Sequence, residues 1–207
     1  MIAGYATPEG TKKFAERQNQ NSHKNYKNVH NLTLSNVGIG TYLGNPDVET
    51  DKLVEDAIKK SILGGINVID SAINYRAQKA ERSVGNAIAQ LIDNNDISRE
   101  EIFVSTKNGY VTNDGDIKED LMQYVMREYG KTGIVKEGDI SPGYHCMTIP
   151  YLNDQLERSL KNLGMDCIDL MYLHNSVEGQ THLPREQFLK ILKMCLIFTK
   201  KAKGRQN

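Results

Sequence analysis

Hydrophobic and polar positions divide the chain into short apolar runs, each followed by a longer segment of helical spacing. The apolar runs predict strands, which we expect near residues 32–39, 66–69, 102–106 and 168–173. The longer segments predict amphipathic helices, which we expect at residues 48–63, 79–92, 152–163 and 185–200. Strand and helix therefore alternate along the chain, which indicates an α/β fold with a parallel sheet covered by helices.

Two stretches depart from this alternation. Residues 1–31 are polar and rich in asparagine, and they predict a disordered or loosely attached N-terminal arm ahead of one α/β unit at 32–207. Residues 109–150 form a long glycine-containing connection with one possible helix at 118–128. Connections of this length in a compact domain are usually lids or binding loops, so we expect a substrate lid. A solvated insertion is the alternative.

Composition narrows the possible partners and the compartment. The 26 basic residues balance the 26 acidic ones, which argues against a nucleic acid or an anionic membrane as the partner. The chain contains neither a long apolar run of about 18 residues nor the apolar core of a signal peptide. Three scattered cysteines without a C-x-x-C pair indicate reduced thiols, and we expect a cytoplasmic protein.

Chemically capable side chains follow three successive predicted strands. Asp70 ends the second strand with Tyr75 in the loop beyond, Lys107 ends the third, and His174 ends the fourth. In βα-barrels, the loops at the carboxyl ends of the strands carry the catalytic groups. Taken singly, these residues have ordinary structural interpretations: a helix cap, a loop aromatic, a surface charge and a strand-end histidine. Their joint placement favours one active site.

These side chains suit the reduction of a carbonyl. A tyrosine with its ordinary pKa near ~10 is a poor acid until a cation stabilises its phenolate. Lys107 can supply that cation, Asp70 can hold the lysine, and His174 can hydrogen-bond the substrate oxygen. The glycines in residues 38–44 spell G-x-G-x-x-x-G, one residue longer than a Rossmann fingerprint, and that alternative leaves the tyrosine, lysine and histidine unexplained.

Four motifs in order resemble those of the aldo-keto reductases, over roughly residues 30 to 180. They are V-G-I-G-T-Y-L-G at 37–44, I-D-S-A-I-N-Y-R at 69–76, V-S-T-K-N-G at 104–109 and D-L-M-Y-L-H-N at 169–175. The resemblance implies a TIM (β/α)8-barrel fold, here truncated to about the first four βα units. It also implies NADPH-dependent reduction of an aldehyde or ketone to an alcohol. The implied catalytic residues are Asp70, Lys107, His174 and the proton donor Tyr75.

The resemblance further implies where the cofactor NADP(H) would bind, and no metal is expected. Residues near the nicotinamide would be Gly40, Thr41, Tyr42 and Asp70, with Asn175 and Ser176 near its carboxamide. Glu81 matches an acid of the family motif, and it is either a helix-surface carboxylate or a support for the site. Arg76 stands where many members have glycine, which affects the expected shape of the tyrosine loop.

The later strands, which hold most of the dinucleotide in the family, have no counterpart after residue 180. The alternative function is therefore a truncated, non-catalytic fragment or an assembly module. Open sheet edges expose unpaired backbone groups, so we expect either self-association or a complementing half-barrel, beside a small-molecule carbonyl substrate. A third possibility is an incomplete gene product. Residues 194–198 are apolar on every side of their helix and would mark where the sequence departs from its ancestor.

Overall fold

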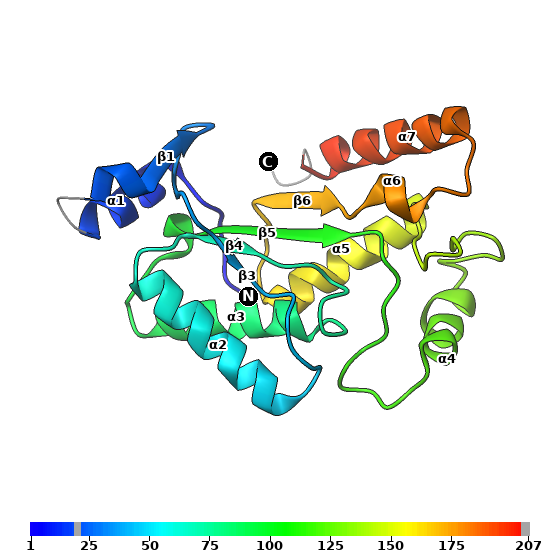
Figure 1. Ribbon diagram of the computed structural model, residues 1–207, viewed down its shortest axis with the longest axis horizontal. Coiled ribbons are helices and arrows are strands. Elements are labelled where there is room, and N and C mark those ends of the chain that lie inside the picture. The colour runs from blue at the N-terminus through cyan, green and yellow to red at the C-terminus, as the bar shows by residue number, and fades with distance from the viewer. Residues whose placement is uncertain (19–21, 204–207) are drawn as a thin grey trace.

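A parallel sheet flanked by helices forms the body of the protein in the computed structural model, which describes residues 1–18 and 22–203 (Figure 1). Within these residues the sheet has the strand order β3-β4-β5-β6. The strands are β3 (Ile39–Gly40), β4 (Val68–Asp70), β5 (Phe103–Asn108) and β6 (Leu170–Leu173). The crossovers contain α2 (Val48–Leu63), α3 (Lys79–Asp93) and α5 (Ile149–Leu163). The predicted α/β alternation is confirmed, and the sheet is open instead of closed into a barrel.

Local sequence explains where these helices begin and end. The Asp47 carboxylate accepts a hydrogen bond of 2.7 Å from the backbone N–H of Thr50 at the start of α2. Gly64 follows the last residue of that helix. Helix α5 has Pro150 in its first turn, and Gly164 ends it with a positive φ of 64°. The predicted bounds of both helices therefore agree with the structure to within a few residues.

The main hydrophobic core lies between the sheet and these three helices. It contains Ile58 and Ile62 of α2, Val84 and Ile88 of α3, Leu163 of α5, and the strand residues Ile69 and Val104. Successive strand residues point to opposite faces of a sheet. Because Ile69 and Val104 face the helices, Asp70, Ser105 and Lys107 point to the other face, where the candidate chemistry gathers.

Within residues 1–18 and 22–31, the N-terminal segment is not a loose arm, which corrects the prediction for these residues. Helix α1 (Pro8–Arg17) follows Thr7, whose hydroxyl accepts from the Gly10 N–H at 3.0 Å. The side chain of Phe14 is fully buried, and Arg17 donates to both carboxylate oxygens of Glu101 at 3.1 and 2.8 Å. Figure 1 shows α1 beyond the amino-terminal ends of the sheet strands. Buried contacts thus fix a segment whose polar composition suggested disorder.

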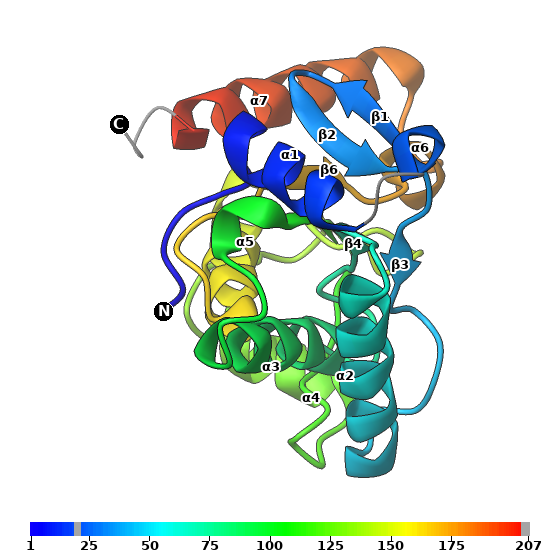
Figure 2. The ribbon, with the colours of Figure 1, turned by 90° about the vertical axis from the view of Figure 1, so that its left-hand side faces the viewer.

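A hairpin replaces the long first strand that the sequence predicts at residues 32–39. After the 3-10 turn at Ser22–Asn25, β1 (Tyr26–Val29) pairs antiparallel with β2 (Leu32–Ser35). His30 and Asn31 form the turn with φ values of 50° and 68°, the geometry that suits a two-residue hairpin. The parallel sheet therefore begins only at β3. Figure 2 shows the hairpin beside α1 at this end of the molecule.

The connection at 109–150 is a packed unit and not a solvated insertion. After the short 3-10 helix at Arg99–Glu101 and strand β5, it forms α4 (Leu121–Val125) and a π-helical turn at Met126–Gly130. These elements enclose a second hydrophobic cluster that includes Val111, Tyr124, Val125, Tyr129, Val135, Cys146 and, from α5, Tyr151. The connection therefore has a core of its own.

The last two helices are α6 (Ser176–Gly179) and α7 (Arg185–Lys203). A third cluster joins Phe188, Ile191, Leu192 and Cys195 of α7 to Met147, Leu152 and Leu173. Met194, Leu196 and Ile197 of the same helix are about half exposed, so α7 has one buried apolar side and one exposed apolar side. Within the described residues, no helix is long and apolar enough to cross a membrane.

We expect Gly85→Ala to destabilise the protein. A Cβ at this position of α3 would lie 2.4 Å from the backbone oxygen of Leu163, so α3 and α5 must move apart. Overpacking of this kind costs about 1–3 kcal/mol, which exceeds the gain of about 1 kcal/mol in helix propensity. Urea unfolding measures the difference. Asn86→Ala on the exposed side of α3 is the control, and a Gly85→Ala variant no less stable than this control would contradict the packing argument.

Candidate active site

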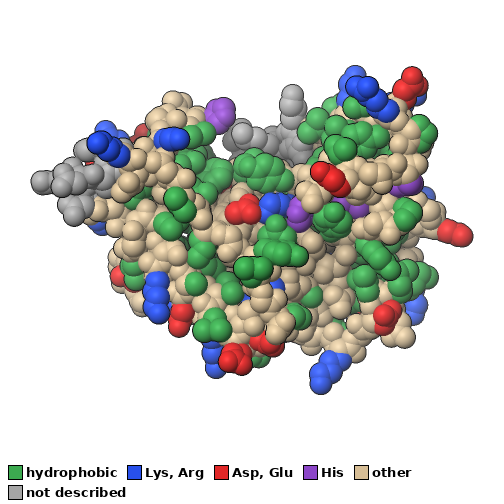
Figure 3. Space-filling view, viewed as in Figure 1, with side chains coloured by type: hydrophobic (Ala, Val, Ile, Leu, Met, Phe, Trp, Pro, Cys, Tyr) green, Lys and Arg blue, Asp and Glu red, His purple; other side chains and the backbone are tan. Residues whose placement is uncertain are grey.

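The four predicted catalytic residues meet at the carboxyl edge of the sheet. Asp70 is the last residue of β4, Lys107 lies near the end of β5, and His174 directly follows β6. Tyr75 lies in the loop after β4 and its ring is 5.6 Å from the His174 ring, centroid to centroid. Figure 3 shows acidic, basic and histidine side chains meeting near the centre of the face drawn, among hydrophobic side chains. The structure therefore brings together residues that are far apart in the sequence.

Lys107 is the centre of this group. Its ammonium donates to Asp70 Oδ2 at 2.5 Å, to the Ser71 carbonyl at 2.7 Å and to the Tyr75 hydroxyl oxygen at 3.2 Å. An ammonium has three hydrogens, so these contacts use its full donor capacity and fix its position. A positive charge is thereby held beside the phenol oxygen, where it would stabilise a negative charge that develops on that oxygen.

His174 is the neutral member of the group. Burial, and after it the charge of Lys107, lowers the pKa of His174 to about 4, so the imidazole is uncharged at pH 7. Its Nδ1 atom lies 3.1 Å from Asn74 Oδ1 in the tyrosine loop. The backbone N–H of His174 donates to the Asn108 carbonyl at 2.8 Å, which continues the pairing of β6 with β5.

The turn that follows Tyr75 is strained and strongly held. Arg76, Ala77 and Gln78 have φ values of 48°, 50° and 71°, a left-handed conformation that is unfavourable for residues with a Cβ. Arg76 pairs with Asp51 at 3.1 Å and donates to Ser83 at 2.7 Å. A glycine would adopt this φ without strain. The buried contacts of Arg76, the residue that departs from the family pattern, therefore stabilise the left-handed conformation of this turn.

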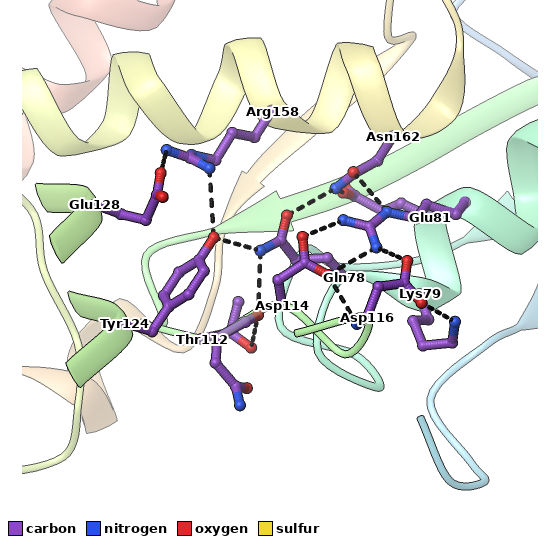
Figure 4. Close-up of polar contacts among 12 residues, drawn as sticks. Gln78, Lys79, Glu81, Thr112, Asp114, Asp116, Tyr124, Glu128, Arg158 and Asn162 are labelled. Atoms are coloured by element: carbon purple, nitrogen blue, oxygen red, sulfur yellow. Dashed lines mark hydrogen bonds and ion pairs between the residues drawn. The ribbon is translucent and has the colours of Figure 1, made fainter. Parts of the chain in front are cut away.

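The same turn anchors the 109–150 connection, as Figure 4 shows. Gln78 donates to the Asn113 carbonyl at 3.1 Å and to the Tyr124 hydroxyl at 3.2 Å. Lys79 pairs with Asp116 at 2.6 Å, and this contact, as its main cause, lowers the pKa of the Asp116 carboxyl. The loop that carries Tyr75 and the base of the connection are therefore one hydrogen-bonded unit.

Glu81 supports the site from the opposite face of the sheet. It is fully buried, and its carboxylate accepts from Thr106 Oγ1 at 2.7 Å and from Asn162 Nδ2 at 3.0 Å. Burial raises the pKa of Glu81. Because Thr106 directly precedes Lys107 on β5, this carboxylate ties α3 and α5 to the strand that carries the lysine. The interpretation of Glu81 as a helix-surface carboxylate is wrong.

The residues that the family resemblance assigns to the cofactor differ in how exposed their side chains are. Gly40 ends β3 beside Asp70 with open space where a Cβ would stand, Tyr42 is 65% exposed, and Asn175 is exposed next to His174. These three lie at or near the edge of the sheet where the candidate catalytic residues gather, and their contact with a nicotinamide stays a prediction. Ser176 begins α6 and is half-buried.

Thr41, also assigned to the cofactor by the resemblance, is buried between two strand ends. Its side chain is buried, and the hydroxyl lies 3.0 Å from Ser71 Oγ and 3.2 Å from the Asp70 carbonyl oxygen. Thr41 therefore joins the ends of β3 and β4, and its contact with a cofactor stays a prediction. The sequence pattern places it beside the site but does not show that its side chain points inward.

Several residues around His174 are not signalled by the sequence pattern. Asn74 lies within the tyrosine motif, but only the structure shows its contact with the His174 ring. Tyr110 packs edge-on against His174 with a centroid distance of 5.0 Å and against His145 at 5.1 Å. His145 comes from the long connection, 29 residues before His174, and no spacing in the sequence signals this contact.

Comparison with known proteins places the chain among relatives of one family. The model of the Aldo/keto reductase family matches residues 36–201. The NADH-specific methylglyoxal reductase of Escherichia coli is 30% identical over 148 residues, which cover 69% of this chain and 39% of that protein. Aldose reductase B of Dictyostelium discoideum is 32% identical over 157 residues, covering 76% of this chain and 37% of that protein. Aldo-keto reductase yakc [NADP(+)] of Schizosaccharomyces pombe is 35% identical over 98 residues, covering 47% and 21%.

The fold is similar to that of a solved aldo-keto reductase, AKR11C1 from Bacillus halodurans in its holo form. The two superpose with a TM-score of 0.50 at 21% identity, over 82% of this chain and 45% of that one. The chain thus spans less than half the length of these relatives, and its open sheet is a fragment of their TIM barrel. On the family match and the shared fold, this chain belongs to the aldo/keto reductase family.

Proposed function

We propose that this chain carries the catalytic residues of an NADPH-dependent reductase that converts an aldehyde or ketone to an alcohol. The observation that carries the proposal is the ammonium of Lys107, which contacts both Asp70 and the hydroxyl of Tyr75. Family membership supports an oxidoreductase function in general. The relatives' names include both NADH and NADP(+), so the choice of NADPH is part of the proposal.

The chemistry follows from the arrangement around Tyr75. When bound, NADPH would supply a hydride to the carbonyl carbon, and Gly40, Tyr42 and Asn175 would border its nicotinamide. The Tyr75 hydroxyl gives its proton to the carbonyl oxygen, which completes the alcohol. The phenolate that remains lies 3.2 Å from the Lys107 ammonium, whose charge stabilises it. Asp70 keeps that ammonium in place.

His174 orients the substrate in this proposal. A neutral imidazole can hydrogen-bond the carbonyl oxygen only if its Nε2 carries the proton. In the structure Asn74 Oδ1 lies 3.1 Å from Nδ1, and an amide oxygen only accepts, so Nδ1 carries the proton there. Donation from Nε2 to the substrate therefore requires the other tautomer, which a 180° rotation of the Asn74 amide would favour. The low pKa of His174 keeps the ring neutral, so Tyr75 and not the histidine is the proton donor.

A partner for the open sheet is part of the proposal. Strands β3 and β6 each pair on one side only within the described residues, and Tyr172 on β6 is 47% exposed. Exposed strand edges favour pairing with another chain. Self-association or a complementary half-barrel would cover these edges. We place the reaction in the cytoplasm, where buried thiols such as Cys146 and Cys195 stay reduced.

NADPH is expected to raise the melting temperature of the purified chain. Selective binding to the folded state stabilises it by about 2.7 kcal/mol at a ligand concentration of 100 Kd, which corresponds to several degrees. Reduced nicotinamide mononucleotide should give a smaller shift of the same sign, because it carries the part that Gly40, Tyr42 and Asn175 border. The absence of any shift at millimolar NADPH would contradict a cofactor site in this chain.

Tyr75→Phe should lower the rate of carbonyl reduction by about 10²- to 10⁴-fold, the usual contribution of a general acid. The matched control is Tyr5→Phe, which removes only a hydroxyl from an exposed tyrosine outside the candidate site. The loss of NADPH absorbance in single turnovers measures both rates. Equal rates in the two variants would exclude Tyr75 as the proton donor.

The His174 imidazole is expected to titrate near pH 4 in the folded protein. Because this pKa lies below the unfolded value near ~6.5, the neutral ring contributes stability above that pH. That contribution falls as the pH drops from about 6.5 towards 4. An NMR titration of the ring gives the pKa directly. Lys107→Met should raise it, since the lysine charge is one cause of the lowering. A His174 pKa near 6.5 in the native protein would contradict the site geometry.

A further inference from the structure

A second, fully buried histidine lies beneath the catalytic group. His145 belongs to the 109–150 connection, and its Nε2 atom is 2.8 Å from the backbone carbonyl oxygen of His174. A carbonyl oxygen only accepts hydrogen bonds, so Nε2 carries the proton. The contact therefore binds the backbone of the catalytic histidine and leaves its ring free for chemistry.

Gln180 fixes the tautomer of His145. Its amide nitrogen lies 3.0 Å from His145 Nδ1 and 3.2 Å from the His145 carbonyl oxygen. Both partners accept when Nε2 carries the proton, so the nitrogen and not the oxygen of Gln180 faces them. Burial lowers the pKa of His145, which keeps the ring neutral. The Nε2–H group is thus a permanent donor that points at His174.

Two glycines leave just enough room for this ring. A Cβ on Gly109 would lie 2.5 Å from His145 Nε2, and a Cβ on Gly179 would lie 2.5 Å from His145 Cγ. Gly109 directly follows β5, and Gly179 ends α6 after β6. His145 is therefore enclosed between the segments that follow the strands of Lys107 and His174.

The backbone of the connection returns to the sheet at the same place. The N–H of Cys146 donates to the Gly109 carbonyl at 2.8 Å, and the N–H of Val111 donates to the Tyr144 carbonyl at 2.7 Å. The ring of Tyr110 packs edge-on against both imidazoles, at 5.1 Å from His145 and 5.0 Å from His174. The segment that follows β5 therefore fixes the position of His145. His145 in turn contacts His174, which directly follows β6.

We propose that His145 is a positioning residue of the active site, which holds the His174 carbonyl through Nε2–H and so places the His174 imidazole beside Tyr75. The 109–150 connection then has a role in aligning the catalytic group. The catalytic meaning of this placement rests on the proposed reductase function, but the placement itself is measurable without turnover.

The test compares His145→Leu, which removes the donor, with His145→Gln, whose amide nitrogen can replace it. Proton–nitrogen correlation spectra of the imidazoles report the tautomer, ring environment and titration of His174. The groups that influence this titration are Lys107, Asp70 and His145. In His145→Leu we expect the His174 ring signals to shift and its pKa to rise towards ~6.5, as the released ring reaches water. His145→Gln should lie close to the native protein.

A folded His145→Leu variant with native His174 signals and native titration would overturn the proposal. If circular dichroism shows that this variant does not fold, Gln180→Leu takes its place. This variant keeps His145 but removes the amide that contacts its Nδ1 atom, so the amide no longer fixes the tautomer of His145. We then expect mixed tautomers at His145 and shifted His174 signals. The control is Gln187→Leu, an exposed glutamine of α7, which should leave both histidines unchanged. Native histidine signals in Gln180→Leu would likewise overturn the proposal.

Kinetics separate the failure of this proposal from the failure of the reductase function. Misplacement of a catalytic group by about 1 Å can cost 10²-fold in rate. We expect kcat to fall at least tenfold in His145→Leu with little change in KM, and to recover in His145→Gln. A native protein without carbonyl reduction would end the reductase proposal, and the spectra alone would then decide the role of His145. Equal kcat in native protein and a folded His145→Leu variant would overturn the positioning role.

Discussion

The ammonium of Lys107 is the contact on which the rest of the candidate site depends. It joins the end of β4, through Asp70 and the Ser71 carbonyl, to the hydroxyl of Tyr75 in the following loop. The lysine side chain is 15% exposed and that of Asp70 is 40% exposed, so water screens the pair and its contribution to stability is modest. Its importance is geometric, because three donors directed at three acceptors leave one position for the charge. The parallel register of β4 with β5 provides that position.

Contacts from several surrounding elements stabilise the arrangement of Lys107, Asp70 and Tyr75. Glu81 holds β5 from the helix side through Thr106, while Arg76 and Gln78 hold the strained turn after Tyr75. The 109–150 connection packs on its own hydrophobic cluster and reaches the site through His145. A substrate-lid role for this connection stays a prediction. Its contacts near the sheet also join it to the backbone of His174. The open strand edges belong to a chain that spans less than half of its relatives.

Sequence pattern was a good guide wherever one segment decides its own structure. Helical spacing, an Asp47 cap and the glycines at 64 and 164 give the bounds of α2 and α5 from neighbouring residues alone. The clustering of the candidate catalytic residues was also predictable, because parallel strands of one sheet end at a common edge. Asp70, Lys107 and His174 therefore meet there without any knowledge of the packing. The N-terminal arm was mispredicted, since the buried contacts of Phe14 and Arg17 are made with distant residues.

The sequence by itself determined the order of strands and helices and the residues at the strand ends, because these depend on local periodicity and on the direction of the strands. Only the tertiary structure decided which side chains around them face the site. Thr41 lies within a matching motif yet turns inward to Ser71, and Arg76 adopts a left-handed turn that its buried ion pair with Asp51 maintains. His145 reaches His174 because the connection folds back between Gly109 and Gly179. Contacts of this kind depend on the path of a long segment through space, and no local pattern encodes that path.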